Sequence, residues 1–335
     1  MSNAEDDVPD IAAQWLAEGR TVALGTVMKT WGSAPRQAGS QIAVRDDGAF
    51  AGSVSGGCVE GVVVEQARAA MEDGRVRKLE FGVADETAWS VGLACGGRIE
   101  IFVEPIAGPR SRDIFAAIKA AKQARRSVVR AVDVLTGEDR LIGAATDGCA
   151  LDKAALEAIR TDRSGCIEIE GRSWLLVVFN PPVDLAIVGA VHVAQSLAKM
   201  AAQCGHDVRV IDPRTSFAME ARFPGIGLSH EWPEEALAKR PPGLRSALVA
   251  LSHDPKLDDP ALSAALASPA FYIGALGSKR THAIRLERLK AHGFSDDALA
   301  RIHGPVGLVI GAKTPAEIAV SILAQITERL RVRPQ

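Results

Sequence analysis

The hydrophobic pattern predicts a series of short strands along the second half of the chain, at residues 184–188, 207–211, 246–251 and 270–273. A helix is predicted after the first, third and fourth of them. Strands that alternate with helices in this way predict a parallel sheet with right-handed crossovers. The last helix has a complete start signal, because Thr314 precedes Pro315 and is followed three residues later by Glu317. This spacing predicts a capping box.

The first half of the chain has a different order of elements. Residues 46–48 read Asp-Asp-Gly between two alternating segments, which predicts a β-hairpin. The expected elements are a helix at 11–18, a strand at 21–28, a loop at 30–36, the hairpin strands 41–45 and 49–54, a helix at 59–71, and strands at 76–81 and 98–103. Residues 110–180 predict helix, strands, helix and strands again, with no motif that carries chemistry.

The sequence Asn180-Pro181-Pro182 is a stiff linker and predicts the domain boundary. We therefore expect an α/β protein with two domains. Residues 1–180 form an N-terminal α+β domain, and residues 184–332 form a C-terminal Rossmann-like domain with a doubly wound parallel sheet.

Composition agrees with this architecture and narrows the functional classes. The chain has 335 residues, 47% of them apolar but only 4% aromatic, so small aliphatic side chains build the cores. The net charge of −2 and the mixed charges give no nucleic-acid or membrane-surface patch. No segment has the pattern of a transmembrane helix or a signal peptide. The five cysteines form no CxxC pair, which favours a reducing compartment and predicts a cytoplasmic location.

The first turn of the C-terminal domain departs from the dinucleotide fingerprint. Glycines are expected at 189, 191 and 194, but the chain has Gly189, Val191 and Ala194. A β-branched side chain at 191 takes the space of the pyrophosphate. Asp212 is placed to bind a ribose hydroxyl. We expect a Rossmann-like sheet that holds no dinucleotide in the usual pose, and an NAD(P)-dependent oxidoreductase is the alternative.

A better anion site follows a later strand, at Gly277, Ser278, Lys279 and Arg280. Ser278 can cap the next helix, whose N-terminal amides favour an anion, and the two basic side chains add charge. An ordinary capped helix end is the alternative. His192 and His253 also come at strand ends, where each is either a general base, an anion contact or a structural histidine.

Two cysteines stand beside glycine pairs in the N-terminal domain. Ser55-Gly56-Gly57-Cys58 ends a strand and opens a helix, whose dipole lowers a thiol pKa. Cys95-Gly96-Gly97 precedes another strand. Both turns predict backbone nests that hold an anion beside a thiolate, and they could face each other. The alternative is two small buried cysteines in tight turns. Cys149, Cys166 and Cys204 have no such setting and are interpreted as packing residues.

The motifs at 30–36, 52–60 and 95–97 resemble the N-terminal domain of the xanthine dehydrogenase accessory protein family, XdhC/CoxI. The C-terminal half resembles the Rossmann-like domain of the same family at 212–214, 217–218, 252–258, 272–280, 304–307 and 317–319. The family's glycine loop commonly reads Gly-x-Gly-His, from which this chain departs at Val191.

The resemblance implies a chaperone more than a catalyst. Family members bind molybdenum cofactor (molybdopterin), help it to acquire sulfur, with a cysteine desulfurase as donor, and pass it to an apo molybdenum hydroxylase. A thiolate at Cys58 or Cys95 would ligate molybdenum or carry persulfide sulfur, and the loop from Gly277 to Arg280 would bind the pterin phosphate. A homodimer is the expected assembly. The competing hypotheses are the NAD(P) oxidoreductase, with His192 or His253 as base, and an interaction scaffold.

Overall fold

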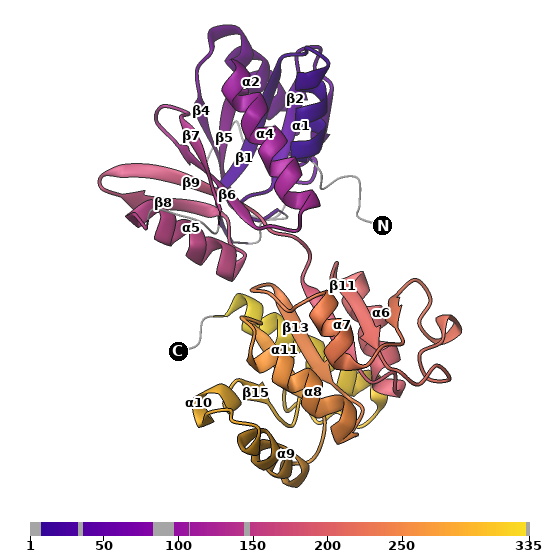
Figure 1. The fold of residues 1–335 in the computed structure, drawn as a ribbon. Coiled ribbons are helices and arrows are strands. Elements are labelled where there is room, and N and C mark those ends of the chain that lie inside the picture. The colour runs from indigo at the N-terminus through magenta and orange to yellow at the C-terminus, as the bar shows by residue number, and fades with distance from the viewer. Residues whose placement is uncertain (1–7, 33–35, 83–96, 107, 144–147, 333–335) are drawn as a thin grey trace. The chain divides into compact units, whose positions relative to one another are not determined.

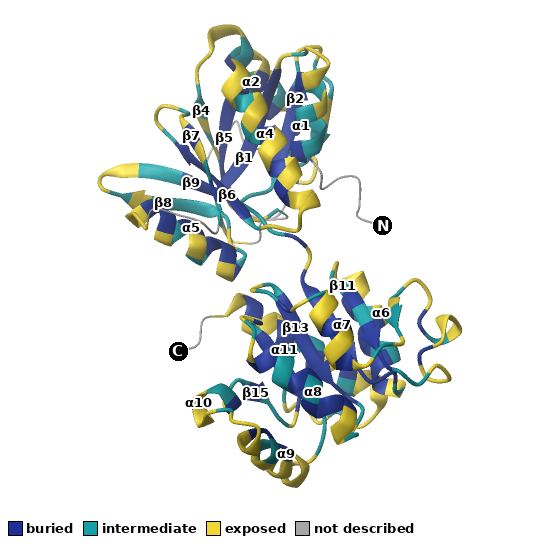
Figure 2. Ribbon diagram, viewed as in Figure 1, coloured by how far each residue is buried: buried dark blue, intermediate teal, exposed yellow. Residues whose placement is uncertain are grey.

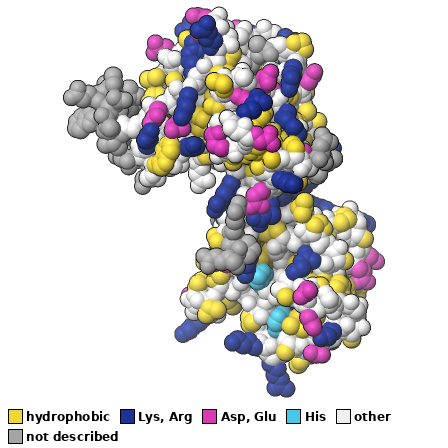
Figure 3. All heavy atoms as spheres, turned by 90° about the vertical axis from the view of Figure 1, so that its left-hand side faces the viewer, with side chains coloured by type: hydrophobic (Ala, Val, Ile, Leu, Met, Phe, Trp, Pro, Cys, Tyr) yellow, Lys and Arg dark blue, Asp and Glu magenta, His cyan; other side chains and the backbone are white. Residues whose placement is uncertain are grey.

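The computed structural model describes residues 8–32, 36–82, 97–106, 108–143 and 148–332. The chain divides into two compact units, Met1–Pro181 and Pro182–Gln335, and each is described by itself (Figure 1). In both units the central strands are buried, and the helices expose one face (Figure 2). Positive and negative side chains are interspersed on the face that Figure 3 draws. No described helix is long and apolar enough to cross a membrane.

The first unit contains a five-stranded antiparallel sheet of order β3-β2-β1-β5-β4. Its strands are β3 (Phe50–Gly52), β2 (Gln41–Arg45), β1 (Val22–Trp31), β5 (Arg98–Ile106) and β4 (Arg77–Phe81). Helix α2 (Glu60–Asp73) packs on one face, while α1 (Val8–Ala17) and α4 (Gly108–Gln123) pack on the other. The sheet therefore has helices on both faces.

A second antiparallel sheet completes this unit, in the order β7-β6-β9-β8. Its strands are β7 (Asp139–Ile142), β6 (Val128–Asp133), β9 (Arg172–Phe179) and β8 (Gly165–Ile169), and α5 (Ala150–Thr161) covers one face. Buried Arg130 pairs with Glu104 and Asp139 at 2.6 Å each, which links β6 to β5 of the first sheet. Removal of one partner would leave a buried charge unpaired.

The second unit is a doubly wound domain with six parallel strands in the order β12-β11-β10-β13-β14-β15. Its strands are β12 (Gly227–Ser229), β11 (Asp207–Ile211), β10 (Asp184–Val188), β13 (Ser246–Ala250), β14 (Tyr272–Ala275) and β15 (Ile302–His303). Helices α6 (His192–Gln203) and α11 (Pro315–Arg331) pack on one face. Helices α7 (Pro233–Lys239), α8 (Pro255–Leu266), α9 (Lys279–Ala291) and α10 (Asp296–Leu299) pack on the other. The predicted Rossmann-like sheet is confirmed.

Local predictions mostly hold. The capping box of α11 is present, because Thr314 Oγ accepts the Glu317 N–H and the Glu317 carboxylate accepts the Thr314 N–H. Several boundaries differ by one to three residues: the helix predicted at 11–18 is α1 (Val8–Ala17), and the strand predicted at 270–273 is β14 (Tyr272–Ala275). The loop predicted from residue 30 starts later, since β1 continues to Trp31, which pairs with Arg98 of β5. Strands β12 and β15 were not predicted, because three- and two-residue strands make no apolar run.

Candidate functional site

The turn that carries Cys58 is organised around the carboxylate of Glu60, the first residue of α2. This carboxylate accepts the backbone N–H groups of Ser55, Gly56 and Gly57 at 2.9, 3.1 and 2.9 Å. The hydroxyls of Ser53 and Ser55 also donate to it. Burial alone would raise the pKa of Glu60, but these hydrogen bonds outweigh burial and lower the pKa to about 2. Glu60 is therefore ionised inside the turn.

The prediction of an open anion nest beside Cys58 is wrong. Gly56 and Gly57 do adopt positive φ angles, +82° and +116°, as a nest requires. Their N–H groups, however, point to Glu60, which is only 7% exposed. The N–H groups of Gly56 and Gly57 already donate to the Glu60 carboxylate, so they are not available to an external anion. The turn thus holds the backbone in place rather than offering it to a ligand.

Cys58 itself lies where the sequence predicts, two residues before α2 begins. Its N–H donates to Ser55 Oγ at 3.0 Å, and its half-buried side chain packs against the core beneath α2. Cys149 and Cys204 are exposed, so the interpretation of these two as packing residues is wrong. They stand at helix ends, beyond the cores. Burial raises the pKa of Cys166 to about 11, as a packing role requires.

The second glycine turn falls largely outside the described residues. Cys95 and Gly96 are not described, whereas Gly97 is buried just before β5. The prediction that the Cys58 and Cys95 turns face each other therefore lies outside the described residues too. Among the described residues, no three His, Cys, Asp or Glu side chains lie close enough to hold a metal ion together.

The C-terminal unit gathers the predicted residues at one edge of its sheet. Parallel strands β11, β10, β13 and β14 are neighbours, so the loops that follow them share that edge. Gly189, after β10, has a φ of +100°, and a Cβ atom there would lie 2.7 Å from Ser252 N. Glycine is therefore required where the two loops cross. Val191 is the N-cap of α6 and packs on the core, while His192 is exposed.

Asp212 does not have the role that the dinucleotide pattern predicts. Its carboxylate is fully buried and accepts the Ala190 N–H at 2.8 Å. Both oxygens also accept from Arg214, through its backbone N–H and its guanidinium. Burial is the largest single influence and would raise the pKa of Asp212, but the hydrogen bonds from Arg214 and Ala190 together outweigh burial and lower the pKa. The expectation of a ribose contact is therefore contradicted, because the carboxylate faces the protein.

Two residues that sequence reasoning missed lie under the same edge. Asp258 and Arg285 are both 2% exposed and lie 3.3 Å apart. Asp258 accepts the Ser252 hydroxyl at 2.6 Å, and Arg285 donates to the Leu276 carbonyl. Burial raises the pKa of Asp258 despite these partners. Above them His253 is exposed, with a left-handed φ of +63°, and such backbone strain often occurs at functional sites.

The loop from Gly277 to Arg280 keeps its predicted local structure. Ser278 is the N-cap of α9 and accepts the Thr281 N–H at 3.1 Å. Lys279 and Arg280 are exposed and make no ion pair within the described part of the chain. The helix N-terminus and two uncommitted cations make this loop the part of the edge best suited to a phosphate.

Comparison with known proteins finds relatives along almost the whole chain. The profile described as the XdhC and CoxI family matches residues 15–82, and that described as the XdhC Rossmann domain matches residues 185–326. The molybdenum cofactor insertion chaperone PaoD of Escherichia coli (strain K12) is 30% identical, across 94% of this chain and 85% of its own. A probable xanthine dehydrogenase subunit of Bacillus subtilis (strain 168) is 25% identical, across 93% of this chain and 94% of its own.

A solved structure has a similar fold. The crystal structure of a xanthine dehydrogenase from Bacillus halodurans covers 98% of this chain and 96% of its own, with a TM-score of 0.67. Sequence identity is 23%, so the similarity supports the fold alone.

Proposed function

Because the chain belongs to the XdhC and CoxI family, as its motifs predict, we propose that it is a chaperone that binds molybdenum cofactor and assists its insertion into an apo molybdenum hydroxylase. The observation that carries this proposal is the similarity to an insertion chaperone over 94% of the chain. That similarity spans both units, so neither is an unrelated addition. The cofactor is the cargo of the reaction, and the protein holds and releases it.

Each unit offers one kind of contact to such a cargo. Cys58 provides a soft sulfur donor on a turn whose backbone Glu60 holds in place. The loop from Gly277 to Arg280 provides a helix N-terminus and two cations for a pterin phosphate. His192 and His253 are exposed on the same sheet edge and are available to the cargo. Cys95, which lies outside the described residues, is proposed as the alternative sulfur donor.

The finer steps belong to the same proposal. A cysteine desulfurase would pass the outer sulfur of its persulfide to the Cys58 thiolate, which leaves the desulfurase thiol and a persulfide on Cys58. The client would be a hydroxylase of the xanthine dehydrogenase or CO dehydrogenase type, and the chaperone would act in the cytoplasm as a homodimer. The oxidoreductase alternative gains no support from the site, since Asp212 is committed to Ala190 and Arg214.

One titration separates these functions. Isolated molybdenum cofactor and NADH are added in parallel to the full chain, and binding is followed by fluorescence. We expect saturable binding of the cofactor, weakened about tenfold or more by Cys58→Ala, with the exposed Cys204→Ala as matched control. Binding of NADH without binding of the cofactor would refute the chaperone proposal. Equal cofactor binding by both cysteine variants would remove Cys58 from it.

A further inference from the structure

Among the described residues, those other than glycine with a left-handed φ lie at helix ends or in a tight hairpin, with one exception. Arg125 follows the end of α4, Asp162 is the C-cap of α5, and Glu170 lies in the two-residue turn between β8 and β9. Such places accommodate a left-handed residue routinely. His253, with a φ of +63°, instead lies in the turn from strand β13 to helix α8. Its conformation therefore has no explanation of that local kind.

The turn around His253 is held from both sides by Ser252. The Ser252 hydroxyl donates to Asp258 Oδ1 at 2.6 Å, and the Ser252 N–H donates to the same oxygen at 3.3 Å. The Ser252 hydroxyl oxygen also accepts the Asp254 N–H at 3.1 Å, which closes the turn over His253. A strained residue persists where its surroundings over-determine the backbone, and these hydrogen bonds do so on both sides of His253.

Asp258 also links this turn to the loop from Gly277 to Arg280. Arg285 Nη2 donates to the carbonyl of Leu276, the residue before that loop, at 2.8 Å, and lies 3.3 Å from Asp258 Oδ2. The contact of the Asp258 carboxylate with the Ser252 hydroxyl is shorter, at 2.6 Å, so the turn is its main partner. A buried chain of three side chains thus fixes the turn relative to the loop proposed for the pterin phosphate.

His253 lies where an open parallel sheet binds its ligands. The chain continues from β10 to β11 on one side, whereas β13, the neighbour of β10 on the other side, continues to β14, so the strand order reverses between β10 and β13. Ligands bind beyond the carboxyl ends of the strands at such a reversal. His253 follows β13 at this point, and its side chain is exposed. A sharp strand-to-helix turn with a strained residue is also a geometry that presents a functional side chain above a parallel sheet.

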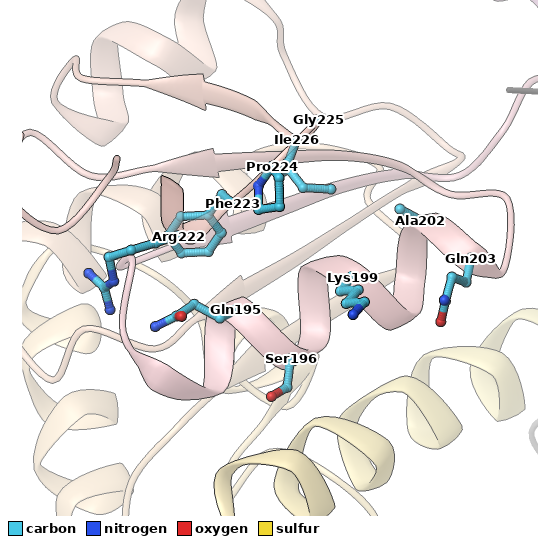
Figure 4. A pocket seen from close by; sticks show the side chains of 10 residues that line it. All are labelled: Gln195, Ser196, Lys199, Ala202, Gln203, Arg222, Phe223, Pro224, Gly225 and Ile226. Atoms are coloured by element: carbon cyan, nitrogen blue, oxygen red, sulfur yellow. The ribbon is translucent and has the colours of Figure 1, made fainter. Parts of the chain in front are cut away.

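The pocket beside α6 offers no comparable contact. It has a volume of about 590 Å³ and lies between α6 and the segment 222–226 (Figure 4). Lys199 and Arg222 line it, but their side chains lie well apart along the pocket instead of converging on one point. The edge at His253 is therefore the stronger place in this unit for a contact with the cargo.

We propose that the His253 imidazole donates a hydrogen bond to an anionic oxygen of the cargo, and that Ser252, anchored by Asp258, is the positioning residue that holds His253 in its left-handed conformation. This inference rests on the proposed chaperone function and adds to it a contact where the strand order reverses. Glycine would adopt the same backbone conformation without strain but would lose the imidazole. The strain is therefore the cost of the contact, and stability and binding respond in opposite directions when the imidazole is removed.

Fluorescence titration of the full chain with isolated molybdenum cofactor, combined with urea unfolding, tests the contact. We expect His253→Gly to keep or raise the urea midpoint, since glycine accepts the left-handed φ, and yet to weaken cofactor binding at least fivefold. His253→Asn, which tolerates this φ and keeps an N–H donor, should recover part of the affinity. Glu170→Gly relieves an exposed left-handed residue of the other unit, so it is the matched control and should leave cofactor binding unchanged.

A double-mutant cycle tests the positioning role. Ser252→Ala breaks the link to Asp258 without leaving the buried charge of Arg285 unpaired. It should weaken cofactor binding about threefold or more in the wild-type background and have no further effect in the His253→Gly background. A merely structural Ser252 would lower the affinity by the same factor in both backgrounds.

The outcomes separate this inference from the function on which it rests. Equal cofactor binding by the wild type and His253→Gly would overturn the inference alone, as would a loss of affinity that comes with a lowered urea midpoint. Equal effects of Ser252→Ala in the two backgrounds would remove Ser252 from the positioning role. Absence of cofactor binding by the wild type would refute the chaperone proposal and this inference with it.

Discussion

The carboxylate of Glu60 accepts the N–H of Gly57 at 2.9 Å, so the chain supplies its own anion to the turn that carries Cys58. A lone Gly-Gly-Cys turn looks like a ligand site because its donors are visible in the sequence. The acceptor is visible there too, as an acidic residue in the first turn of a helix. The sequence does not show that the Glu60 side chain folds back over the N-terminus of α2 and accepts the N–H groups of the preceding turn.

Glu60→Gln should destabilise the chain by about 2 kcal/mol, because an amide cannot accept from so many donors and brings N–H groups into their midst. Alkylation of Cys58, followed by mass spectrometry of its peptide, should also become faster as the turn loosens. Glu65→Gln, an exposed change on the same helix, is the control. Unchanged urea unfolding and an unchanged alkylation rate would show that Glu60 does not hold the turn.

The same carboxylate should make stability depend on pH. The pKa of Glu60 is about 2 in the folded chain, below its ordinary value of 4.5. Its stabilisation is therefore fully present above pH 4.5 and is lost as pH falls toward 2. The difference in unfolding free energy between wild type and Glu60→Gln should be largest near pH 6 and should shrink at pH 4 and pH 3. A difference that stays constant over this range would contradict the assignment.

Much of the fold follows from the sequence. The strands β10 and β11 match residues 184–188 and 207–211. The sequence of β10 is apolar after Asp184 because a central parallel strand is covered on both faces, while β11 shows the alternation of a half-buried strand. The α11 cap follows equally well, because its partners are three residues apart. These features are local in sequence or depend on hydrophobicity alone.

The polar contacts of the site could not be predicted in this way. Asp212 reaches Ala190 across 22 residues, and Arg285 reaches Asp258 across 27. A hydrophobic pattern marks such residues only as polar positions near strand ends or on helices. Which side chain turns inward depends on the packing of neighbouring loops, such as the contact of Gly189 with Ser252.

Val191→Gly should not create NADH binding. The substitution restores the second glycine of the fingerprint, but the Asp212 carboxylate stays buried against Ala190 and Arg214, so no acceptor is left for the ribose. NADH fluorescence titration of both proteins should show no saturable binding. Micromolar binding by the variant would mean that Asp212 can turn outward, and the oxidoreductase hypothesis would return.

Gly189→Ala should be among the most damaging single changes in the C-terminal unit. The added Cβ would lie 2.7 Å from Ser252 N, a backbone atom that cannot swing aside, and φ at this position is +100°. Backbone strain of about 1–2 kcal/mol adds to an overpacking cost of about 1–3 kcal/mol. Gly205→Ala separates the two effects, because Gly205 has a φ of +79° with nothing within 4 Å of its Cβ position. In urea unfolding, Gly189→Ala should lose clearly more stability than Gly205→Ala. Equal losses would mean that the β10 and β13 loops move apart freely.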